Sequence, residues 1–584
     1  MLPILLFIWV CPLQAATYYV SNSIGNDLHN GKSWQTPWKY HPWMSKATGV
    51  AGNTILQPGD KVRLKRGDVW YDYFTLRDAG TQNNLIITKA YGSGYLPRII
   101  CPTQKITSGW VRVSGNIYRI QIDHAGEDVG WVWQEYVSRN SALQMRSDPN
   151  VSEGEFFFEY VNDTRGYLYL YKEGGDSPNG TPIHYSSKKF VIDGLGTSAA
   201  YVRFENLELW GGNWGTVVIT GNWQSARSNI ELHRLIVRFS GSSETSENTE
   251  GTSTAIRIIN YSNSAITNSR ILNTAGDGIR FAAVYDSIIA NNVVGYHSAG
   301  NGKWTGGIRI IGRRASQGPL NIIVEHNSVY RAMRSTKSNG IWADVSAHNV
   351  TIRYNEIYSG KNGIQIENGS AYNSAYYNII GNCQNGFKLG THSIPGNLGV
   401  FNNKIYNNLI VNCEISFTLL RDASGTNEIK NNISYNPTKF HVKLYKDFFS
   451  NGYLDMDNNC FFPKAVNGFG FLVLKGRSPN LVREKKNSSA WQGLGYDFRS
   501  IFDDPGFENS KYRNYHLLDD SPCIDEGAEV RLDQDMEGVF VPQGNSPDIG
   551  PFEFESFQSG PAAPANVQIL SGLNIENLSP GVVE

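Results

Sequence analysis

Charged side chains are scarce in this chain, and neither sign dominates. Among 584 residues, 52 are Lys or Arg and 53 are Asp or Glu, so the net charge is −1 and the charged fraction is 18%. Proteins that bind nucleic acids or anionic membrane surfaces electrostatically need a basic excess. The composition therefore gives no support to a nucleic-acid partner. Its 14 Trp and 31 Tyr residues are more typical of a protein that handles neutral polar polymers.

Long apolar runs are missing beyond the first residues. Residues 1–16, MLPILLFIWVCPLQAA, form an apolar stretch that ends in small residues. This is typical of a secretory signal peptide, although the usual positive n-region is absent. The run is too short for a spanning helix, and no later stretch approaches the roughly 18 apolar residues that one needs. We expect a secreted, soluble monomer, periplasmic or extracellular, with no membrane span.

Cysteine is rare and irregularly spaced. Five of the six cysteines lie after residue 16, and none forms a CxxC pair, which argues against a zinc site. Cys383 and Cys413 stand in similar phrases, GNCQN and VNCEI, and we expect them to stack in adjacent coils of a repeat. They are predicted to be buried thiols, with a disulfide between them as the alternative.

What the sequence does contain is a short phrase repeated along the chain. GIWAD begins at Gly340 and GIQIE begins at Gly363, an offset of 23 residues, which suits one coil of a parallel β-helix. Side chains alternate along a strand, so the apolar positions face the core and the acids Asp344 and Glu367 face outward. We expect the two acids to be exposed at the same place on neighbouring rungs.

Similar phrases begin at Gly278, Gly307 and Gly386, which makes the successive intervals 29, 33, 23 and 23 residues. These segments lack the 3.6-residue period of a helix. They predict an all-β fold, a single-stranded parallel β-helix, with Asn residues between strands acting as turn residues or stacked Asn ladders. The two long intervals predict loops before Gly307 and Gly340 that line a binding face.

Both ends of the chain carry phrases that resemble those of secreted right-handed parallel β-helix proteins acting on polysaccharides. The resemblance lies in ATYYVSNSIGNDLHN and QPGDKVRLKRGDVWY at the start, and in DPGF, SPCIDEG and DIGPFE near the end. Aromatic segments such as GEFFFEY and GYLYLYKEG predict an inserted antiparallel β element. The predicted divisions are a signal peptide (1–16), an N-terminal cap with the first coils (17–101), the inserted β element (102–187), the parallel β-helix core (188–437), C-terminal coils and cap (438–555), and a flexible tail (556–584).

Aligning the Gly-Ile phrases gives two outward-facing columns. The second position after each Gly carries Arg280, Arg309, Trp342, Gln365 and Lys388, and the fourth carries Ala282, Ile311, Asp344, Glu367 and Gly390. Two acids, an aromatic ring, an amide and flanking cations suit a sugar site, in which the Trp ring stacks on a pyranose and the polar groups bond its hydroxyls. We therefore predict that Trp342, Arg309, Gln365 and Lys388 bind substrate, and that His297, in the loop before Gly307, reaches over the same face.

The spacing of the two acids bears on mechanism. Neighbouring rungs lie about 4.7–4.9 Å apart, so carboxyls that project in parallel are separated by roughly 5 Å, as in retaining glycosidases. Crowding two carboxylates raises one pKa, which leaves one group protonated as the acid and the other ionised as the nucleophile. This geometry favours double-displacement glycoside hydrolysis.

Residues 340–390 also resemble the catalytic coils of β-helical exo-acting glycosidases, such as the β-helix β-xylosidases. The resemblance is carried by GIWADVSAHNVTIRYN and GIQIENGSAYNSAYYN. It implies that Asp344 is the nucleophile and Glu367 the acid/base of an enzyme that cleaves poly- or oligosaccharides. The sugar specificity does not transfer with the resemblance.

Three alternatives remain open. The first is that Asp344 and Glu367 are merely solvated surface acids. The second is calcium ligation by these acids with Asn339 or Asn362, in a polysaccharide lyase or epimerase that uses Lys388 or Arg309 on a uronate. The third is a noncatalytic glycan-binding solenoid. The preferred hydrolase needs no cofactor or metal, and fold alone cannot choose between these functions.

Overall fold

The computed structural model describes residues 15–555, apart from short internal segments. The segments left out are 124–128, 136–139, 147, 163, 223–226, 243–252, 300–303, 313–318, 333–337, 359, 391–398, 421–424, 446–453, 467 and 477–480. The predicted flexible tail and all but the last two residues of the predicted signal peptide lie outside the described residues.

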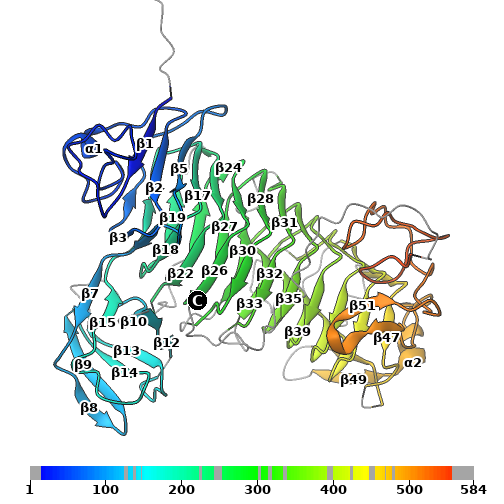
Figure 1. Cartoon of the computed structure of the whole chain (residues 1–584). Coiled ribbons are helices and arrows are strands. Elements are labelled where there is room, and N and C mark those ends of the chain that lie inside the picture. Colours follow the sequence, from blue (N-terminus) through cyan, green and yellow to red (C-terminus); the bar gives the residue numbers. More distant parts are fainter. Residues whose placement is uncertain are drawn as a thin grey trace, which may run out of the picture.

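Three long sheets run along the molecule and form its body (Figure 1). Sheets A and B each have 13 strands, and sheet C has 12. Each coil passes through sheets B, A and C in turn, as β33 (Ser338–Asp344), β34 (Val350–Arg353) and β35 (Glu356–Tyr358) do before β36 (Asn362–Ile366) returns to sheet B. Successive coils pair in parallel, so the predicted parallel β-helix is confirmed.

The remaining strands of the body follow the same order. Sheet A contains β1 (Thr17–Val20), β2 (Lys61–Lys65), β5 (Ile86–Tyr91), β17 (Val202–Glu205), β21 (Ile230–His233), β25 (Ala265–Thr267), β28 (Ser287–Ala290), β31 (Ile322–Glu325), β34, β37 (Ser374–Tyr376), β40 (Lys404–Tyr406), β43 (Asn427–Lys430) and β46 (Leu454–Asp457). Sheet B contains β4 (Phe74–Thr75), β16 (Ile192–Gly194), β19 (Val217–Thr220), β23 (Ile256–Ile259), β27 (Ile279–Ala282), β30 (Thr305–Ile311), β33, β36, β39 (Asn385–Leu389), β42 (Ile415–Leu419), β45 (Phe440–Tyr445), β48 (Phe471–Lys475) and the antiparallel β49 (Val482–Lys486). Sheet C contains β3 (Val69–Tyr71), β6 (Arg98–Ile100), β18 (Glu208–Trp210), β22 (Ile236–Ser240), β26 (Arg270–Thr274), β29 (Val293–Gly295), β32 (Ser328–Tyr330), β35, β38 (Ile379–Gly381), β41 (Leu409–Val411), β44 (Ile433–Tyr435) and β47 (Cys460–Phe462).

A column of glycines lies where sheet C turns into sheet B. A Cβ on Gly340 would lie 2.3 Å from Cγ2 of Ile357, and one on Gly363 would lie 2.2 Å from Cγ2 of Ile380. These isoleucines belong to β35 and β38 of sheet C and are fully packed in the core. The repeated Gly therefore reflects steric need, because branched side chains of the neighbouring sheet fill the space that a Cβ would take.

Stacked asparagines fix the register of the coils. Nδ2 of Asn327, Asn355 and Asn378 each donates to Oδ1 of the corresponding Asn one coil further on, at 3.0, 3.0 and 2.9 Å. The same amides also donate to backbone carbonyls, as Asn355 does to Val324 O. The predicted Asn ladder is confirmed, and its buried amides are satisfied from coil to coil.

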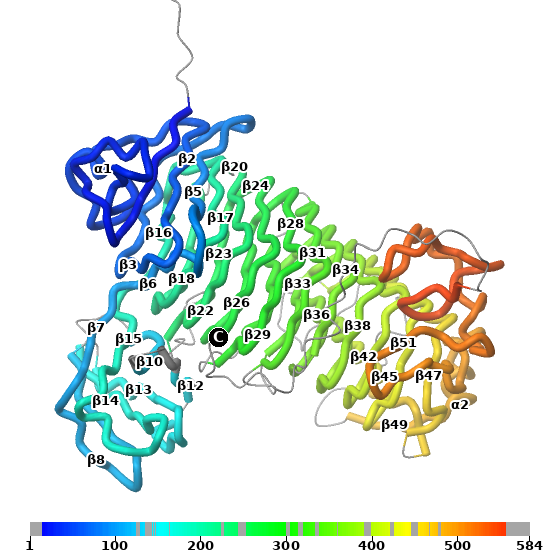
Figure 2. Tube along the Cα trace, in the orientation of Figure 1, coloured from blue at the N-terminus to red at the C-terminus, as the bar shows by residue number. Residues whose placement is uncertain are grey.

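An antiparallel element branches from the N-terminal end of the body (Figure 2). Its four-stranded sheet contains β11 (Asn140–Ala142), β10 (Val132–Glu135), β15 (Ile183–Ser186) and β7 (Thr103–Ile106), and its five-stranded sheet contains β12 (Gln144–Met145), β13 (Glu155–Asn162), β14 (Arg165–Tyr171), β9 (Ile117–Asp123) and β8 (Val111–Ser114). Phe156 and Phe158 of β13 are buried against the apolar face of this element. The predicted inserted β element is present, and its aromatic residues pack in a cluster that also includes Trp210 and Phe239 of the body.

Small elements complete the described chain. These are α1 (Gly49–Asn53), α2 (Ser488–Gln492), the 3-10 helix η2 (Ser510–Tyr512), and the short pairs β20 (Arg227–Ser228) with β24 (Tyr261–Ser262) and β50 (Phe507–Asn509) with β51 (Asn514–Leu517). None of the helices described is long enough to cross a membrane. Cys383 and Cys413 are buried free thiols, as predicted, and each follows a paired strand of sheet C by two residues.

Candidate active site

The outer face of sheet B aligns the predicted substrate-binding residues in one column. Arg280 pairs with Arg309 between β27 and β30, and Arg309 pairs with Trp342 between β30 and β33. The column continues through Gln365 on β36 to Lys388 on β39. The register predicted from the Gly-Ile phrases is therefore confirmed over five coils.

The two acids end neighbouring strands of this face. Asp344 is the last residue of β33 and pairs with Ile311. Glu367 directly follows β36, and its backbone N–H donates to Ala343 O at 3.1 Å. The acids thus occupy equivalent places on adjacent rungs, which are about 4.8 Å apart.

The expectation that these acids are exposed is wrong. Asp344 is 1% exposed and Glu367 is 5% exposed, although both lie on the outer face of the sheet. The alternation of side chains correctly predicts which face they occupy, but it says nothing of what packs over that face. A shallow hollow among Phe440, Val466 and Phe469 belongs to later coils and does not surround the two acids.

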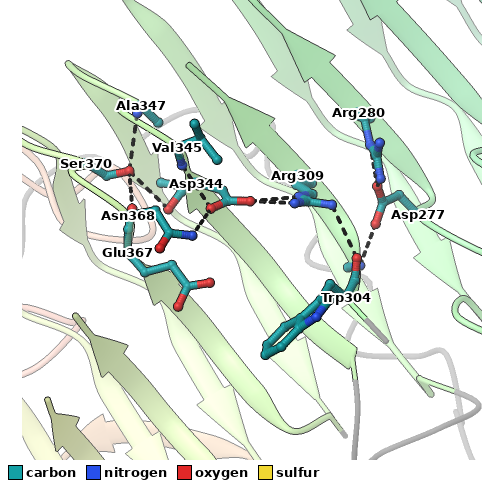
Figure 3. Close-up of polar contacts among 12 residues, drawn as sticks. Asp277, Arg280, Trp304, Arg309, Asp344, Val345, Ala347, Glu367, Asn368 and Ser370 are labelled. Carbon is teal, nitrogen blue, oxygen red and sulfur yellow. Dashed lines mark hydrogen bonds and ion pairs between the residues drawn. The ribbon is translucent and has the colours of Figure 1, made fainter. Parts of the chain in front are cut away.

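Asp344 is held by side chains from both neighbouring rungs (Figure 3). Its Oδ2 accepts hydrogen bonds from Nε of Arg309 at 3.1 Å and Nη2 at 2.5 Å. Its Oδ1 accepts from Nδ2 of Asn368 at 2.7 Å and from the N–H of Val345 at 2.9 Å. Four hydrogen bonds, two of them from one guanidinium, suit an ionised carboxylate.

Glu367 has fewer partners and a different protonation tendency. Burial raises the pKa of its carboxyl above the usual value, the Lys388 ammonium opposes that rise, and the nearby charge of Asp344 adds to it. Nζ of Lys388 lies 3.3 Å from Oε2 of Glu367. Burial also lowers the pKa of Lys388. The pair of acids therefore has unequal surroundings, as an acid and a nucleophile require.

Trp342 does not offer an open face. Its ring is 2% exposed, and the Arg309 guanidinium lies 4.0 Å from the ring centroid. The predicted stacking of a sugar on this ring therefore does not hold in this structure, because a cation already covers it. Trp304 is 58% exposed, lies 6.5 Å from Trp342 between ring centroids, and accepts a hydrogen bond from Arg309 through its backbone carbonyl.

His297 is buried beside Ser298. Its Nδ1 is 3.0 Å from Oγ of Ser298, to which Thr305 also bonds. Burial lowers the pKa of His297 to about 4, against the opposing effect of Asp277. The described hydrogen bond of His297 is to Ser298 and not to either of the two acids.

Two residues join the site that the sequence did not single out for it, and Trp304, from the loop expected to reach over this face, stands with them. Asn368 follows Glu367 directly and bonds Asp344, and Asp277 pairs with Arg280 through its carboxylate. Trp304 stands beside Arg309 in Figure 3. The phrase GIQIEN contained the signal for Asn368, whereas Trp304 lies in a loop without repeat periodicity.

Calcium does not fit the two acids as they are arranged. Arg309 and Lys388 already contact Asp344 and Glu367, so cationic side chains take the places of a metal. Among the described residues, no group of three or more His, Cys, Asp or Glu side chains is placed to hold a metal ion.

Comparisons with known proteins give relatives at the level of structure. No family model matches the sequence, and no curated protein matches it. The solved complex of XylC with xylose aligns over 92% of this chain and 98% of its own, with 13% identity and a TM-score of 0.56. The GH136 lacto-N-biosidase from Eubacterium ramulus aligns over 78% and 68% of the two chains, with 16% identity and a TM-score of 0.46.

The pectate lyase Pel9A aligns over 93% of this chain and 97% of its own, with 12% identity and a TM-score of 0.44. At these identities the likeness concerns the fold and not the chemistry. Together with the three parallel sheets, the alignment with XylC shows that this chain folds as a right-handed parallel β-helix.

Proposed function

We propose that the protein is a glycoside hydrolase that cleaves poly- or oligosaccharides with retention of configuration. Asp344 is the nucleophile and Glu367 the acid/base. The observation that supports this assignment is the unequal setting of two buried carboxyls on adjacent rungs: a guanidinium and an amide hold Asp344, whereas burial raises the pKa of Glu367. The complex of the similarly folded XylC with xylose supports a sugar ligand.

In the first step, the Glu367 carboxyl gives its proton to the glycosidic oxygen as the bond from that oxygen to the anomeric carbon breaks. An Oδ atom of Asp344 attacks the same carbon and forms a covalent ester. All four hydrogen bonds to Asp344 are directed at its two oxygens. Attack therefore requires that at least one donor, such as Arg309, loosens its contact.

In the second step, the Glu367 carboxylate takes a proton from water, which attacks the anomeric carbon and releases Asp344. Lys388 suits this half of the cycle because its Nζ lies 3.3 Å from Glu367 and stabilises the ionised form. The same contact keeps the Glu367 pKa from rising further. Lys388 is thus a positioning residue that keeps both the protonated and the ionised form of Glu367 accessible.

A lyase or epimerase is the second candidate, and one observation favours it. Burial lowers the pKa of Lys388, which would help a neutral amine abstract the proton next to a uronate carboxylate. Its contact with Glu367 opposes that role, since the carboxylate stabilises the ammonium. In either case we propose that the protein acts outside the cytoplasm, as a monomer.

The test uses a panel of plant and algal polysaccharides together with aryl glycosides. A hydrolase releases reducing ends, whereas a lyase leaves unsaturated ends that absorb in the ultraviolet. Proton NMR of the first product gives its anomeric configuration, which we expect to match that of the substrate. Inverted product, or unsaturated product without hydrolysis, would exclude the retaining mechanism.

The variants Asp344→Asn and Glu367→Gln should each abolish turnover. Glu356→Gln is the matched control, because burial also raises the pKa of Glu356, which lies on β35 of sheet C. We expect this control to keep the wild-type rate. Hydrolysis that survives in both Asp344→Asn and Glu367→Gln contradicts the assignment.

A further inference from the structure

Two buried hydrogen-bond donors beside the acids lack partners. Nε1 of Trp342 and Nε2 of Gln365 are both inaccessible, and neither has a hydrogen-bond partner among the described residues. They occupy successive places in the outer column of sheet B. Leaving a buried donor unbonded costs roughly 1–3 kcal/mol, so two such donors on adjacent rungs point to an acceptor that comes from outside the chain.

The Gln365 amide is oriented by the asparagine ladder next to it. Its Oε1 accepts from Nδ2 of Asn362 at 2.5 Å, and Nδ2 of Asn362 also lies 2.7 Å from Oδ1 of Asn339. The next rung repeats the contact, with Asn385 donating to Asn362 at 2.8 Å. This chain of amides turns the Gln365 NH2 group away from the ladder. A weak contact of this amide with Glu367 lowers the pKa of that carboxyl, but it does not reach the geometry of a full hydrogen bond.

The two cations nearest these donors are already paired with carboxylates. Arg309 pairs with Asp344, and Lys388 pairs with Glu367. One rung from Arg309, Arg280 pairs with Asp277, and Arg257 lies beyond Arg280. The donors left over at the acids are therefore neutral N–H groups, which suit an uncharged oxygen better than an anion.

We propose that Trp342 Nε1 and Gln365 Nε2 bind oxygens of a neutral sugar, so that the residue cleaved at the acids is an uncharged glycoside and not a uronate or a sulfated sugar. This inference rests on the proposed function and narrows its substrate class. It also reverses the role predicted for Trp342, which recognises the sugar through its N–H while Arg309 covers its ring.

The test compares Trp342→Phe and Gln365→Met with the wild type on 4-nitrophenyl glycosides of xylose, glucose and glucuronic acid, in both anomeric forms. We expect measurable turnover of a neutral glycoside and none of the glucuronide. Each variant should raise KM for the neutral glycoside about three- to tenfold, the size of one lost hydrogen bond. The melting temperature of the free protein should stay level or rise, because each change removes an unbonded donor.

Trp491→Phe is the matched control. Trp491 is equally buried, but its Nε1 donates to Oδ2 of Asp497 at 2.8 Å. Its replacement should lower the melting temperature and leave KM unchanged. A Trp342→Phe variant that behaves like Trp491→Phe, with lower stability and unchanged KM, would show a structural donor and overturn the proposal. Preference for the glucuronide would overturn it as well.

Binding measured without turnover separates this inference from the proposed function. Xylose, glucose and glucuronate are added to the wild type and to Trp342→Phe, and the shift in melting temperature is recorded. If no glycoside is cleaved but a neutral sugar stabilises only the wild type, the hydrolase proposal fails and the neutral site stands. If hydrolysis occurs but glucuronate stabilises the protein more than either neutral sugar, the neutral-sugar inference is overturned and the hydrolase proposal stands. If neither neutral sugar shifts the melting temperature at any soluble concentration, the inference is likewise overturned.

Discussion

Two sets of buried carboxyl groups in this protein differ in what holds them. The pair Asp344 and Glu367 lies on the outer face of sheet B. The trio Asp535, Asp548 and Glu553 lies in the C-terminal segment, and its members are 2%, 3% and 5% exposed, as little as the pair. Burial alone therefore does not distinguish the two sets.

The donors to the two sets make the difference. Asp548 accepts hydrogen bonds from the backbone N–H groups of Asp525 and Phe554, at 2.7 and 2.6 Å. Glu553 accepts from the N–H groups of Asp548 and Gln543. The pair is instead held chiefly by side chains of other rungs, Arg309, Asn368 and Lys388.

Backbone donors cannot move without unfolding the loop that carries them, whereas side chains can change rotamer and exchange partners. The trio thus closes turns near the end of the chain, whereas the side chains that hold the pair can exchange partners, as the proposed catalytic role requires. The following experiments separate the two sets.

The largest expected effect is on turnover. Asp344→Asn and Glu367→Gln should each reduce kcat by about 10³-fold or more, as expected for a nucleophile and an acid/base. The melting temperature of Glu367→Gln should change by no more than about 2–3 °C, because the amide fits the same space. Asp344→Asn should lower it further, because the buried Arg309 guanidinium loses its counter-charge. Steady-state kinetics and differential scanning calorimetry on the same samples check both values. A large loss of stability in Glu367→Gln, with kcat unchanged, would place Glu367 with the trio.

Removing a member of the trio should lower stability and leave turnover unchanged. Asp548→Ala leaves two backbone N–H groups without acceptors, at roughly 1–3 kcal/mol each, and should lower the melting temperature by several degrees. The kcat on a neutral glycoside should stay at the wild-type value. A fall in kcat at a temperature where the variant is fully folded would mean that the two sets are coupled.

The dependence of stability on pH should also separate the trio from the pair. Burial raises the pKa of Asp548 to about 6 and that of Glu553 to about 7. These pKa values exceed those of the same groups in the unfolded chain. Their contribution to the free energy of unfolding is therefore complete below about pH 4 and is lost as the pH rises to 7. Melting temperatures between pH 4 and 8 should fall, and Glu553→Gln should flatten the curve. An unchanged slope in that variant would remove Glu553 as the cause.

The dependence of activity on pH should come from Glu367 and not from the trio. Under the proposed mechanism hydrolysis requires protonated Glu367, so its raised pKa should set the alkaline limb of kcat/KM. Replacing Lys388 by Met removes the cation that lowers this pKa, so the limb should move to higher pH. A pH–rate profile of the variant checks the direction, and a limb that moves to lower pH contradicts the assignment of Glu367 as the acid.

The smallest expected effect concerns Trp304, whose ring is exposed beside the site. Trp304→Ala should raise KM for oligosaccharides about threefold to tenfold through lost ring contacts with a sugar, with kcat little changed. Trp34, which is 59% exposed in the N-terminal region, provides the control, and Trp34→Ala should leave KM unchanged. Equal effects of the two changes would exclude a specific role for Trp304.

The repeat made much of the fold predictable. Gly-Ile phrases and a two-residue alternation were enough to predict the parallel coils and the column from Arg280 to Lys388. The assignment of catalytic roles to Asp344 and Glu367 remains a prediction. What the sequence could not predict was the environment of these side chains.

Alternation along a strand places a side chain on a face but does not say whether other parts of the chain cover that face. For this reason the predicted exposure of Asp344 and the predicted open ring of Trp342 were wrong. The position of His297 was unpredictable for a related reason, because it lies at the end of a coil where the strand pattern stops. Asn368, by contrast, could have been predicted, since it directly follows Glu367 in the repeated phrase.

The stacking of coils gives the distance between the two acids an unusual property. Backbone pairing fixes the separation of rungs at about 4.8 Å, so acids borne by different coils can be moved apart only in whole steps. One further coil inserted between β33 and β36 would separate them by about 9–10 Å, close to the 6.5–9.5 Å span of inverting glycosidases. In this architecture the number of coils between the two acids would decide whether hydrolysis retains or inverts the anomeric configuration. A duplication of 23 residues could therefore convert a retaining site into an inverting one.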